Sequence, residues 1–229
     1  MGASASRPAW MHWAAAGALS RLATAVEILL VYAGILLYIW RWQFTHPRAW
    51  MALLALVLAS HVVHRDRLRE LGLTSSELGP SATLVLRLAV AIYVPLACYG
   101  FLSRTLTLLP LTPRAFSMFV SYGIWCLFQQ YLTQSYFHHR LMSIIPNRNL
   151  SSLLVALMFG GAHIPNPILM VVTTAGGFIL AQVFSRHRNI WPLGLAQAAG
   201  GFLVAALSPA SLIHNMRVGP GYFFYGLPQ

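Results

Sequence analysis

Residues 128–134 read Phe-Gln-Gln-Tyr-Leu-Thr-Gln and lie in an apolar stretch, 115–137, that contains no acidic or basic residue. Two later apolar stretches each add a polar side chain, His163 and Gln197. Polar side chains at membrane depth are energetically costly, so by default they indicate a functional site. The glutamine amides neither bind nor release a proton near neutral pH. These residues therefore indicate where a site lies more clearly than what it does.

The composition is that of a membrane protein. The chain has 229 residues, of which 58% are hydrophobic and only 8% are charged, whereas soluble domains carry about 25% charged residues. Several apolar runs approach the length of about 20 residues that a bilayer-spanning helix needs. We therefore expect an all-α fold, a polytopic transmembrane helix bundle that forms a single membrane domain over residues 1–229.

Hydropathy predicts about seven spans between an N-terminal segment, 1–21, and an interfacial tail, 208–229, with the bundle at 22–207. An aromatic anchor at 222–225 is expected in the tail. The predicted spans are 22–40, 49–63, 81–102, 115–137, 151–163, 168–184 and 190–207.

The charge is strongly basic, with a formal net charge of +11. All of the basic residues are arginines, and they lie singly or in small groups between apolar segments, which is typical of loops beside anionic lipid headgroups. We therefore expect membrane lipids as partners and no nucleic acid. With seven spans, nine arginines fall on the side of the N-terminus and five on the other side, which favours a cytoplasmic N-terminus in an integral, multi-pass protein.

Residues 64–73 alternate charge and leucine at helical spacing and end at Gly72. This pattern predicts a short charged helix on the headgroup surface.

The three glutamines at 129, 130 and 134 are the candidate site on the fourth span. On an α-helix Gln130 and Gln134 share a face, and Gln129 points about 100° away from Gln130. An amide facing lipid would lose its hydrogen bonds, so this face should point inward. One interpretation is that the amides only join helices, at roughly 1 kcal/mol each. The other is that they line a cavity together with Phe159, His163 and Gln197.

The order and spacing of these motifs resemble those of the intramembrane glutamic endopeptidases, the type II CAAX prenyl proteases and their bacterial relatives in bacteriocin processing and immunity. The family has two adjacent acids with an Arg four residues after the second, then Phe-x-x-x-His, then His-x-x-x-Asn. The resemblance extends from Gly123 to Val204. It implies the family's intramembrane helical fold, in which a Glu aided by His residues activates water to attack a peptide bond.

Position by position, the resemblance retains the framework but not the charges. Phe159 and His163 match the second motif, and the other positions differ: Gln129 and Gln130 stand for the paired acids, Gln134 for the Arg, Gln197 for the His and Gly201 for the Asn or Asp. A general base typically contributes about 10²–10⁴-fold to a rate, and an amide has no usable basicity. The resemblance thus implies a degenerate site in which His163 alone could still accept a proton.

Glu27 is the only acid inside a predicted span, and we expect it to lie near the cavity or to pair at the interface with Arg21 or Arg87. As a displaced base, Glu27 or His163 could restore activity. His138 and His139 are neighbours that point apart, and too few ligands converge elsewhere, so we expect no metal and no cofactor.

Three functions remain open at this point. The first is a non-proteolytic protein that binds a lipid, a prenyl chain or a partner helix in the former active-site cavity. The second is an active intramembrane endopeptidase for a prenylated or membrane-anchored peptide, with an altered base. The third is a different enzyme that acts on an isoprenoid or lipid substrate.

Overall fold

The computed structural model describes residues 9–107 and 112–224, and within these ranges the regular secondary structure is helical with no strand. Two helices continue directly into π-helical segments, which are labelled η. The elements are α1 (Ala9–Leu37), η1 (Tyr38–Trp42), α2 (Gln43–Thr45), α3 (Ala49–His64), α4 (Leu78–Leu102), α5 (Pro113–Gln130), η2 (Tyr131–His138), α6 (His139–Ile144), α7 (Arg148–Gly161), α8 (Pro167–Phe184), α9 (Ile190–Leu207), α10 (Ala210–Ile213), the 3₁₀ turn η3 (His214–Met216) and α11 (Pro220–Phe223).

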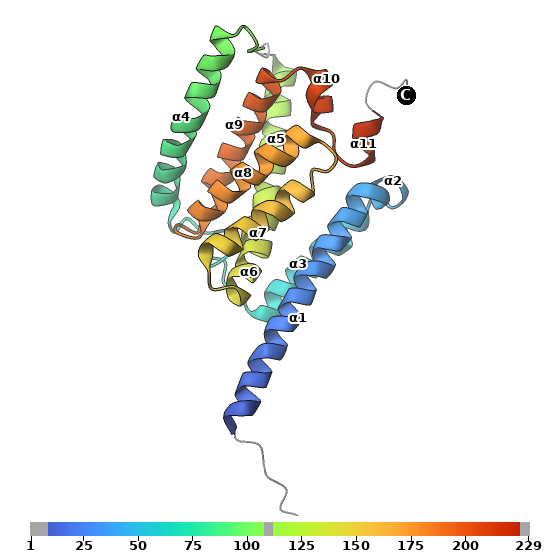
Figure 1. Cartoon of the computed structure of the whole chain (residues 1–229), viewed down its shortest axis with the longest axis vertical. Helices are drawn as coiled ribbons and strands as arrows, with labels where there is room; N and C mark the ends of the chain where they lie inside the picture. Colours follow the sequence, from blue (N-terminus) through green and yellow to red (C-terminus); the bar gives the residue numbers. More distant parts are fainter. Residues whose placement is uncertain (1–8, 108–111, 225–229) are drawn as a thin grey trace, which may run out of the picture.

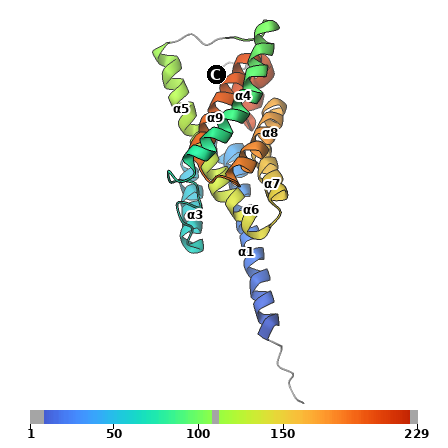
Figure 2. The same cartoon turned by 90° about the vertical axis from the view of Figure 1, so that its left-hand side faces the viewer.

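The chain runs back and forth between two ends of a bundle (Figure 1). α7 and α8 pack as an antiparallel pair, and α9 packs against both α4 and α5. Figure 2 shows α3 and α5 on one side of α9, with α7 and α8 on the other. The N-terminal part of α1 extends beyond the bundle (Figure 1).

The helical architecture expected from hydropathy is confirmed, and each predicted span overlaps a helix. Among the described residues, four helical segments are long and apolar enough to cross a membrane: Ser20–Thr45, Leu78–Leu102, Pro167–Phe184 and Ile190–Leu207. α3 is apolar but shorter, and α7 is also short, with 14 residues. The count of seven spans therefore stays a prediction.

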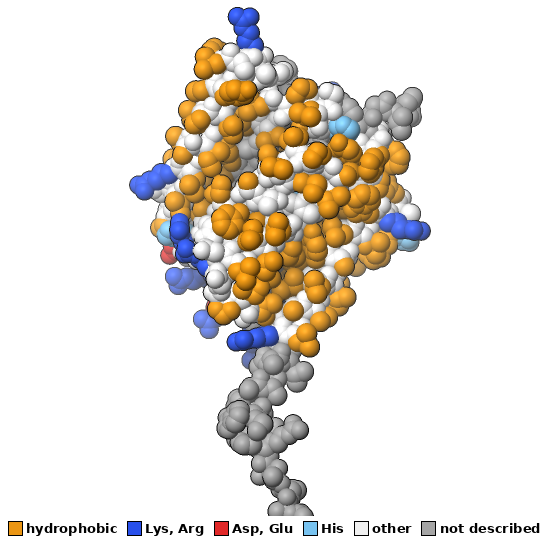
Figure 3. Space-filling view, viewed as in Figure 1, with side chains coloured by type: hydrophobic (Ala, Val, Ile, Leu, Met, Phe, Trp, Pro, Cys, Tyr) orange, Lys and Arg blue, Asp and Glu red, His pale blue; other side chains and the backbone are white. Residues whose placement is uncertain are grey.

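Large apolar side chains cover much of the face of the bundle shown in Figure 3. Leu30, Val63 and Leu86 are between 64% and 77% exposed. In water such a surface would be a large aggregation-prone patch, whereas lipid tails solvate it. The outer surface therefore agrees with a bundle that faces lipid.

Asparagine caps set where α7, α8 and α9 begin. The side chains of Asn147, Asn166 and Asn189 accept hydrogen bonds from the free backbone N–H groups of the first turn, which is the usual way to satisfy these donors. Asn189 has no exposed surface, and its amide also donates to the carbonyls of Thr74 and Ser76. The start of α9 is thus fixed to the loop that precedes α4.

The short surface helix predicted over residues 64–73 is wrong, because α3 ends at His64 and turns follow. Three contacts explain the difference. Asp66 is drawn inward by Arg140, Leu71 is 3% exposed, and the carbonyl of Gly72 accepts from the N–H of Ile190. Tertiary contacts therefore override the local amphipathic pattern.

The C-terminal segment packs onto the turn between α7 and α8. Asn166 donates to the carbonyl of Ile213 at 2.8 Å, and the N–H of Gly219 donates to the carbonyl of Ile164 at 2.9 Å. The expected interfacial position of this tail stays a prediction. Tyr225, the last residue of its aromatic run, lies outside the described residues.

Candidate functional site

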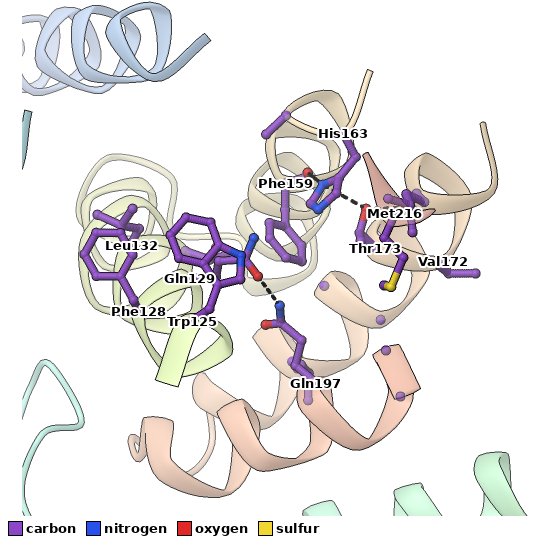
Figure 4. A pocket seen from close by; sticks show the side chains of 18 of the residues that line it. Trp125, Phe128, Gln129, Leu132, Phe159, His163, Val172, Thr173, Gln197 and Met216 are labelled. Carbon is purple, nitrogen blue, oxygen red and sulfur yellow. Dashed lines mark hydrogen bonds between the residues drawn. The ribbon is translucent and has the colours of Figure 1, made fainter. Parts of the chain in front are cut away.

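A cavity of about 1060 Å³ lies among α1, α3, α4, α5, α7, α8 and α9. Ligand cavities usually measure about 300–1,000 Å³, so this one is large enough for a lipid-sized molecule. Its lining is overwhelmingly aliphatic and aromatic. The predicted site residues Gln129, Phe159, His163 and Gln197 are all among the lining residues (Figure 4).

Three glutamines form a continuous hydrogen-bonded chain between α5 and α9. Gln130 Nε2 donates to Gln197 Oε1 at 2.6 Å, and Gln197 Nε2 donates to Gln129 Oε1 at 2.6 Å. Gln130 has no exposed surface, whereas Gln129 and Gln197 line the cavity. We call this arrangement the amide chain. Each amide is neutral and is both a donor and an acceptor. The amide chain therefore satisfies itself without a counter-ion.

Two glycines on α9 let this helix pass close to α5. A Cβ atom at Gly194 would lie 3.1 Å from the Cα of Leu127, and one at Gly201 would lie 2.8 Å from ring atoms of Tyr122. The close approach brings the glutamine side chains within reach of one another. At Gly201, where the family has Asn or Asp, Tyr122 fills the space that a side chain would need.

His163 lies just beyond the end of α7. Its Nδ1 atom is 2.7 Å from the carbonyl oxygen of Phe159, so Nδ1 carries the hydrogen and donates it. Phe159 packs edge-on against the imidazole, with ring centroids 5.0 Å apart. Figure 4 shows His163 and Gln129 on either side of Phe159. In the described part of the chain no hydrogen bond joins His163 to the amide chain, so the two polar sites in the cavity are separate.

Gln134, which the sequence places in the cavity lining beside Gln130, lies outside that lining. It has no exposed surface, and its Oε1 atom is 3.0 Å from Nδ1 of His138. The chain changes from α-helix to π-helix at Tyr131, and the i→i+5 bonding of a π-helix rotates later residues away from the α-helical register. Gln134 therefore packs within the protein.

Glu27 also lies outside the cavity lining. Its carboxylate accepts from Tyr136 at 2.9 Å, is 3.0 Å from Nε2 of His64 and is 3.5 Å from Nε of Arg140. The expected pairing with Arg21 or Arg87 is therefore wrong. Glu27 is held in a polar network behind the cavity wall.

That network centres on Arg140, whose side chain is 2% exposed. The guanidinium donates to both carboxylate oxygens of Asp66, at 2.6 and 3.1 Å, and to Ser60 Oγ at 2.8 Å. His61 and His139 lie 2.7 and 3.2 Å from the same carboxylate. We call these residues, with Glu27, the Arg140 network. A bidentate guanidinium–carboxylate pair is the strongest arrangement available to such groups.

The Arg140 network was not found by sequence reasoning. Burial alone would raise the pKa of Asp66, but hydrogen bonds from Arg140 and His61 and the charge of Arg140 outweigh it and hold the pKa well below its usual range. The available signal was that Asp66 is the only aspartate in the chain. A lone acid next to a predicted span needs a cation, and Arg140 follows the end of another predicted span.

One group of side chains has the spacing of a cation site: Asp66, Glu70 and His139 offer ligand atoms within 4.8 Å of one another. Both oxygens of Asp66 are already bonded to Arg140, and Arg188 lies 3.2 Å from Nδ1 of His139. These two guanidinium groups supply positive charge where a metal ion would sit and oppose its binding. The expectation of no metal stays a prediction.

The apolar helices and the apolar cavity that they enclose define an integral membrane protein built as a helix bundle. Residues 110–203 match the family model described as Rce1-like, "Type II CAAX prenyl endopeptidase Rce1-like". The match confirms the resemblance seen in the sequence and covers most of α5 to α9, the elements that carry the amide chain and His163. The protein is therefore CAAX-protease-like in this region. No curated protein and no solved structure matches the chain.

Proposed function

We propose that this protein is a non-proteolytic, CAAX-protease-like membrane protein that binds a lipid or prenyl chain, or the apolar segment of a partner helix, in the cavity. The observation that carries the proposal is the chemistry of the cavity wall. It is large and apolar, and neutral amides stand where the family resemblance expects catalytic acids.

The contacts of the remaining acids support this proposal. Glu27, the one acid in a predicted span, is bonded to Tyr136, His64 and Arg140 and does not line the cavity. No Asp or Glu is among the described residues that line the cavity. A base must come within hydrogen-bond reach of the water that it activates. His163 is therefore the one candidate base in the lining, and it has no carboxylate beside it.

Several lining residues are themselves exposed on the outer surface, which supports entry from the bilayer. Trp50 on α3 and Ile124 and Trp125 on α5 line the cavity and are between 45% and 63% exposed. α3 and α5 are not closely packed against each other. An apolar chain could pass between them without crossing water, which suits a lipid ligand.

The test is to purify the full chain in a mild detergent and identify the molecules that co-purify by lipid and peptide mass spectrometry. We expect a stoichiometric apolar ligand. Leu180→Trp would fill the cavity from α8 and should lower retention of that ligand. Leu195→Trp, a 60% exposed position on α9 that does not line the cavity, is the matched control and should leave retention unchanged.

A parallel assay separates binding from catalysis. Purified protein is incubated with a panel of prenylated and membrane-anchored peptides, and we expect no cleavage. Cleavage that disappears in His163→Ala or Glu27→Gln would overturn the non-proteolytic assignment and favour an endopeptidase with an altered base. Changed lipid species in cells that carry the protein would instead favour a lipid-modifying enzyme.

A further inference from the structure

The amide chain has a direction, because Gln130 donates to Gln197 and Gln197 donates to Gln129. Gln130 Oε1 and Gln134 Nε2 are fully buried and have no hydrogen-bond partner among the described residues. The first is an acceptor, the second is a donor, and the two residues are one turn apart. Neither residue lines the cavity, so both atoms belong to the packed interior.

This direction fixes what the amide chain offers to the cavity. Gln129 Oε1 accepts from Gln197, so the free end of the amide chain is the Nε2 group of Gln129. Figure 4 shows the oxygen of Gln129 toward Gln197 and its nitrogen turned away. Nε2 has no partner among the described residues, and Gln129 lines the cavity. The cavity therefore contains an N–H donor that needs an acceptor.

His163 offers the opposite group. Its Nδ1 hydrogen points to the carbonyl of Phe159, with Thr173 Oγ1 a second neighbour at 3.4 Å. In the neutral ring this leaves Nε2 as an acceptor with a free lone pair. No described residue occupies it. The cavity thus has a donor at Gln129 and an acceptor at His163, on either side of Phe159.

The described residues that line the cavity include no Arg, Asp or Glu. Two tyrosine hydroxyls of the wall are already hydrogen-bonded, since Tyr32 donates to the carbonyl of Met158 and Tyr93 to that of Ala196. A charged group brought into this space would lose its hydration without gaining a counter-ion. The ligand portion inside the cavity must therefore be uncharged.

We propose that the cavity selects an uncharged lipid whose head is a hydroxyl group, a long-chain alcohol in chemical class. The hydroxyl oxygen accepts from Gln129 Nε2, and its hydrogen is donated to His163 Nε2 directly or through one water. This inference rests on the proposed function, because it specifies which apolar ligand the same cavity holds. It excludes lipids that would need a phosphate or carboxylate inside the cavity.

The test compares ligands of one chain length on the full-length protein in lipid nanodiscs. The probes are 1-hexadecanol, hexadecane and hexadecyl phosphate, and binding is measured by native mass spectrometry. The extra hydrogen bonds should make 1-hexadecanol bind about tenfold more tightly than hexadecane. Hexadecyl phosphate should bind no more tightly than hexadecane.

Single variants identify the side chain that causes the preference for 1-hexadecanol over hexadecane. Gln129→Leu should abolish the advantage of 1-hexadecanol while hexadecane still binds, which also reports that the cavity is folded. Gln43→Leu removes another amide from the cavity lining and should keep the advantage. Equal binding of all three probes, or strongest binding of hexadecyl phosphate, would overturn this inference and leave the proposed function intact. Failure of every probe to bind would overturn both.

Discussion

Gln130 is the most enclosed member of the amide chain, with no exposed surface and one bonded atom, Nε2. Buried polar groups are stabilising only when their partners are present, because an unpaired amide forfeits the hydrogen bonds that water supplies to the unfolded chain. Gln197 is therefore the structural centre of the site, since it bonds to Gln130 and to Gln129.

Gln197→Leu should lower the free energy of unfolding by about 1–3 kcal/mol, because it leaves the Gln130 amide buried without a partner. The double variant Gln130→Leu with Gln197→Leu should lose less than the single variant, since both polar partners are then gone. Denaturant titration in detergent measures the free energy of unfolding of each variant. Gln182→Leu, which removes only an exposed bond to Asn149, should stay within about 0.5 kcal/mol of the wild type. A larger loss in the double variant would contradict the role assigned to Gln197.

Arg140 shows the opposite case, a buried charge that is stabilised by several partners. Arg140→Met leaves Asp66 buried without its bidentate partner, and breaking such a pair typically costs about 3–5 kcal/mol. Thermal unfolding in detergent should show a large fall in midpoint. Arg69→Met is the control, because Arg69 is exposed in the same loop and its side chain bonds to none of the described residues. Its effect should be within about 0.5 kcal/mol. Equal effects of the two changes would mean that the Arg140 network does not stabilise the fold.

Between elements, the small residues decide which helices touch. α7 and α8 approach closely at Gly160, where a Cβ atom would lie 3.0 Å from the carbonyl oxygen of Met170 and 3.2 Å from Cβ of Thr174. At Gly176, in the next helix, a Cβ atom would meet nothing within 4 Å. The two glycines therefore have different roles although both lie in apolar helices.

Gly160→Ala should destabilise the protein by about 1–3 kcal/mol, because the added methyl forces α7 and α8 apart. Gly176→Ala should be neutral or stabilising by up to about 1 kcal/mol, since alanine favours the helix and meets no neighbour. Denaturant unfolding in detergent measures the change in the free energy of unfolding for both variants. The prediction fails when both changes have the same sign and size.

His138, which lies where η2 meets α6, should make the free energy of unfolding depend on pH. Burial, followed by the positive charges of Arg188 and His139, lowers the pKa of His138 to about 4. In the unfolded chain the pKa is about 6.5, so between these values the unfolded state binds more protons. Stability therefore rises with pH from about 4 to 6.5 and falls on acidification, by at most about 1.36 kcal/mol per pH unit for one group.

The measurement is the unfolding midpoint of the wild type and of His138→Gln between pH 7 and pH 4.5. Glutamine can still bond to Gln134 and Ser152, but it does not titrate. The variant should show a shallower pH dependence in this range. Parallel curves for the two proteins would show that His138 does not control it.

At the scale of the whole molecule, the sequence predicted the helix positions well. The last span, predicted over 190–207, coincides with α9, and the third differs from α4 only by its start. Hydropathy sufficed because lipid must solvate every outward face of a spanning helix. The same logic directed the glutamine amides toward neighbouring helices, where Gln129 and Gln130 on α5 bond to Gln197 on α9.

Contacts between distant segments could not be predicted. Asp66 and Arg140 are far apart in the sequence and meet only after α3, α6 and η2 have packed. The turns that replace the predicted helix at 64–73 have the same origin. Leu71 is buried, and the carbonyl of Gly72 accepts from Ile190, the first residue of α9. The π-helical register of η2, which removes Gln134 from the cavity, has no signal in hydropathy.

The distribution of charge over the molecule gives a topology that can be tested. The four acids, Glu27, Asp66, Glu70 and Glu77, are bonded at the end of the bundle where α3 stops and α4 and α9 begin. Nine arginines belong to this side if the chain crosses seven times, against five on the other side. Positive residues are enriched in cytoplasmic loops, so this end, together with the N-terminus, should face the cytoplasm.

Single cysteines introduced at Ser75 and at Thr45 test this topology, because both positions are exposed and lie at opposite ends of α3. The background is Cys98→Ala with Cys126→Ala, which removes both native thiols. A membrane-impermeant maleimide should label Thr45→Cys in intact cells and Ser75→Cys in inverted membrane vesicles. Labelling of both from one side would mean that α3 does not cross the bilayer, and it would reduce the span count. The reverse pattern would keep the crossing but place the N-terminus outside, since the first helix enters from the side that holds the residue 65–77 loop.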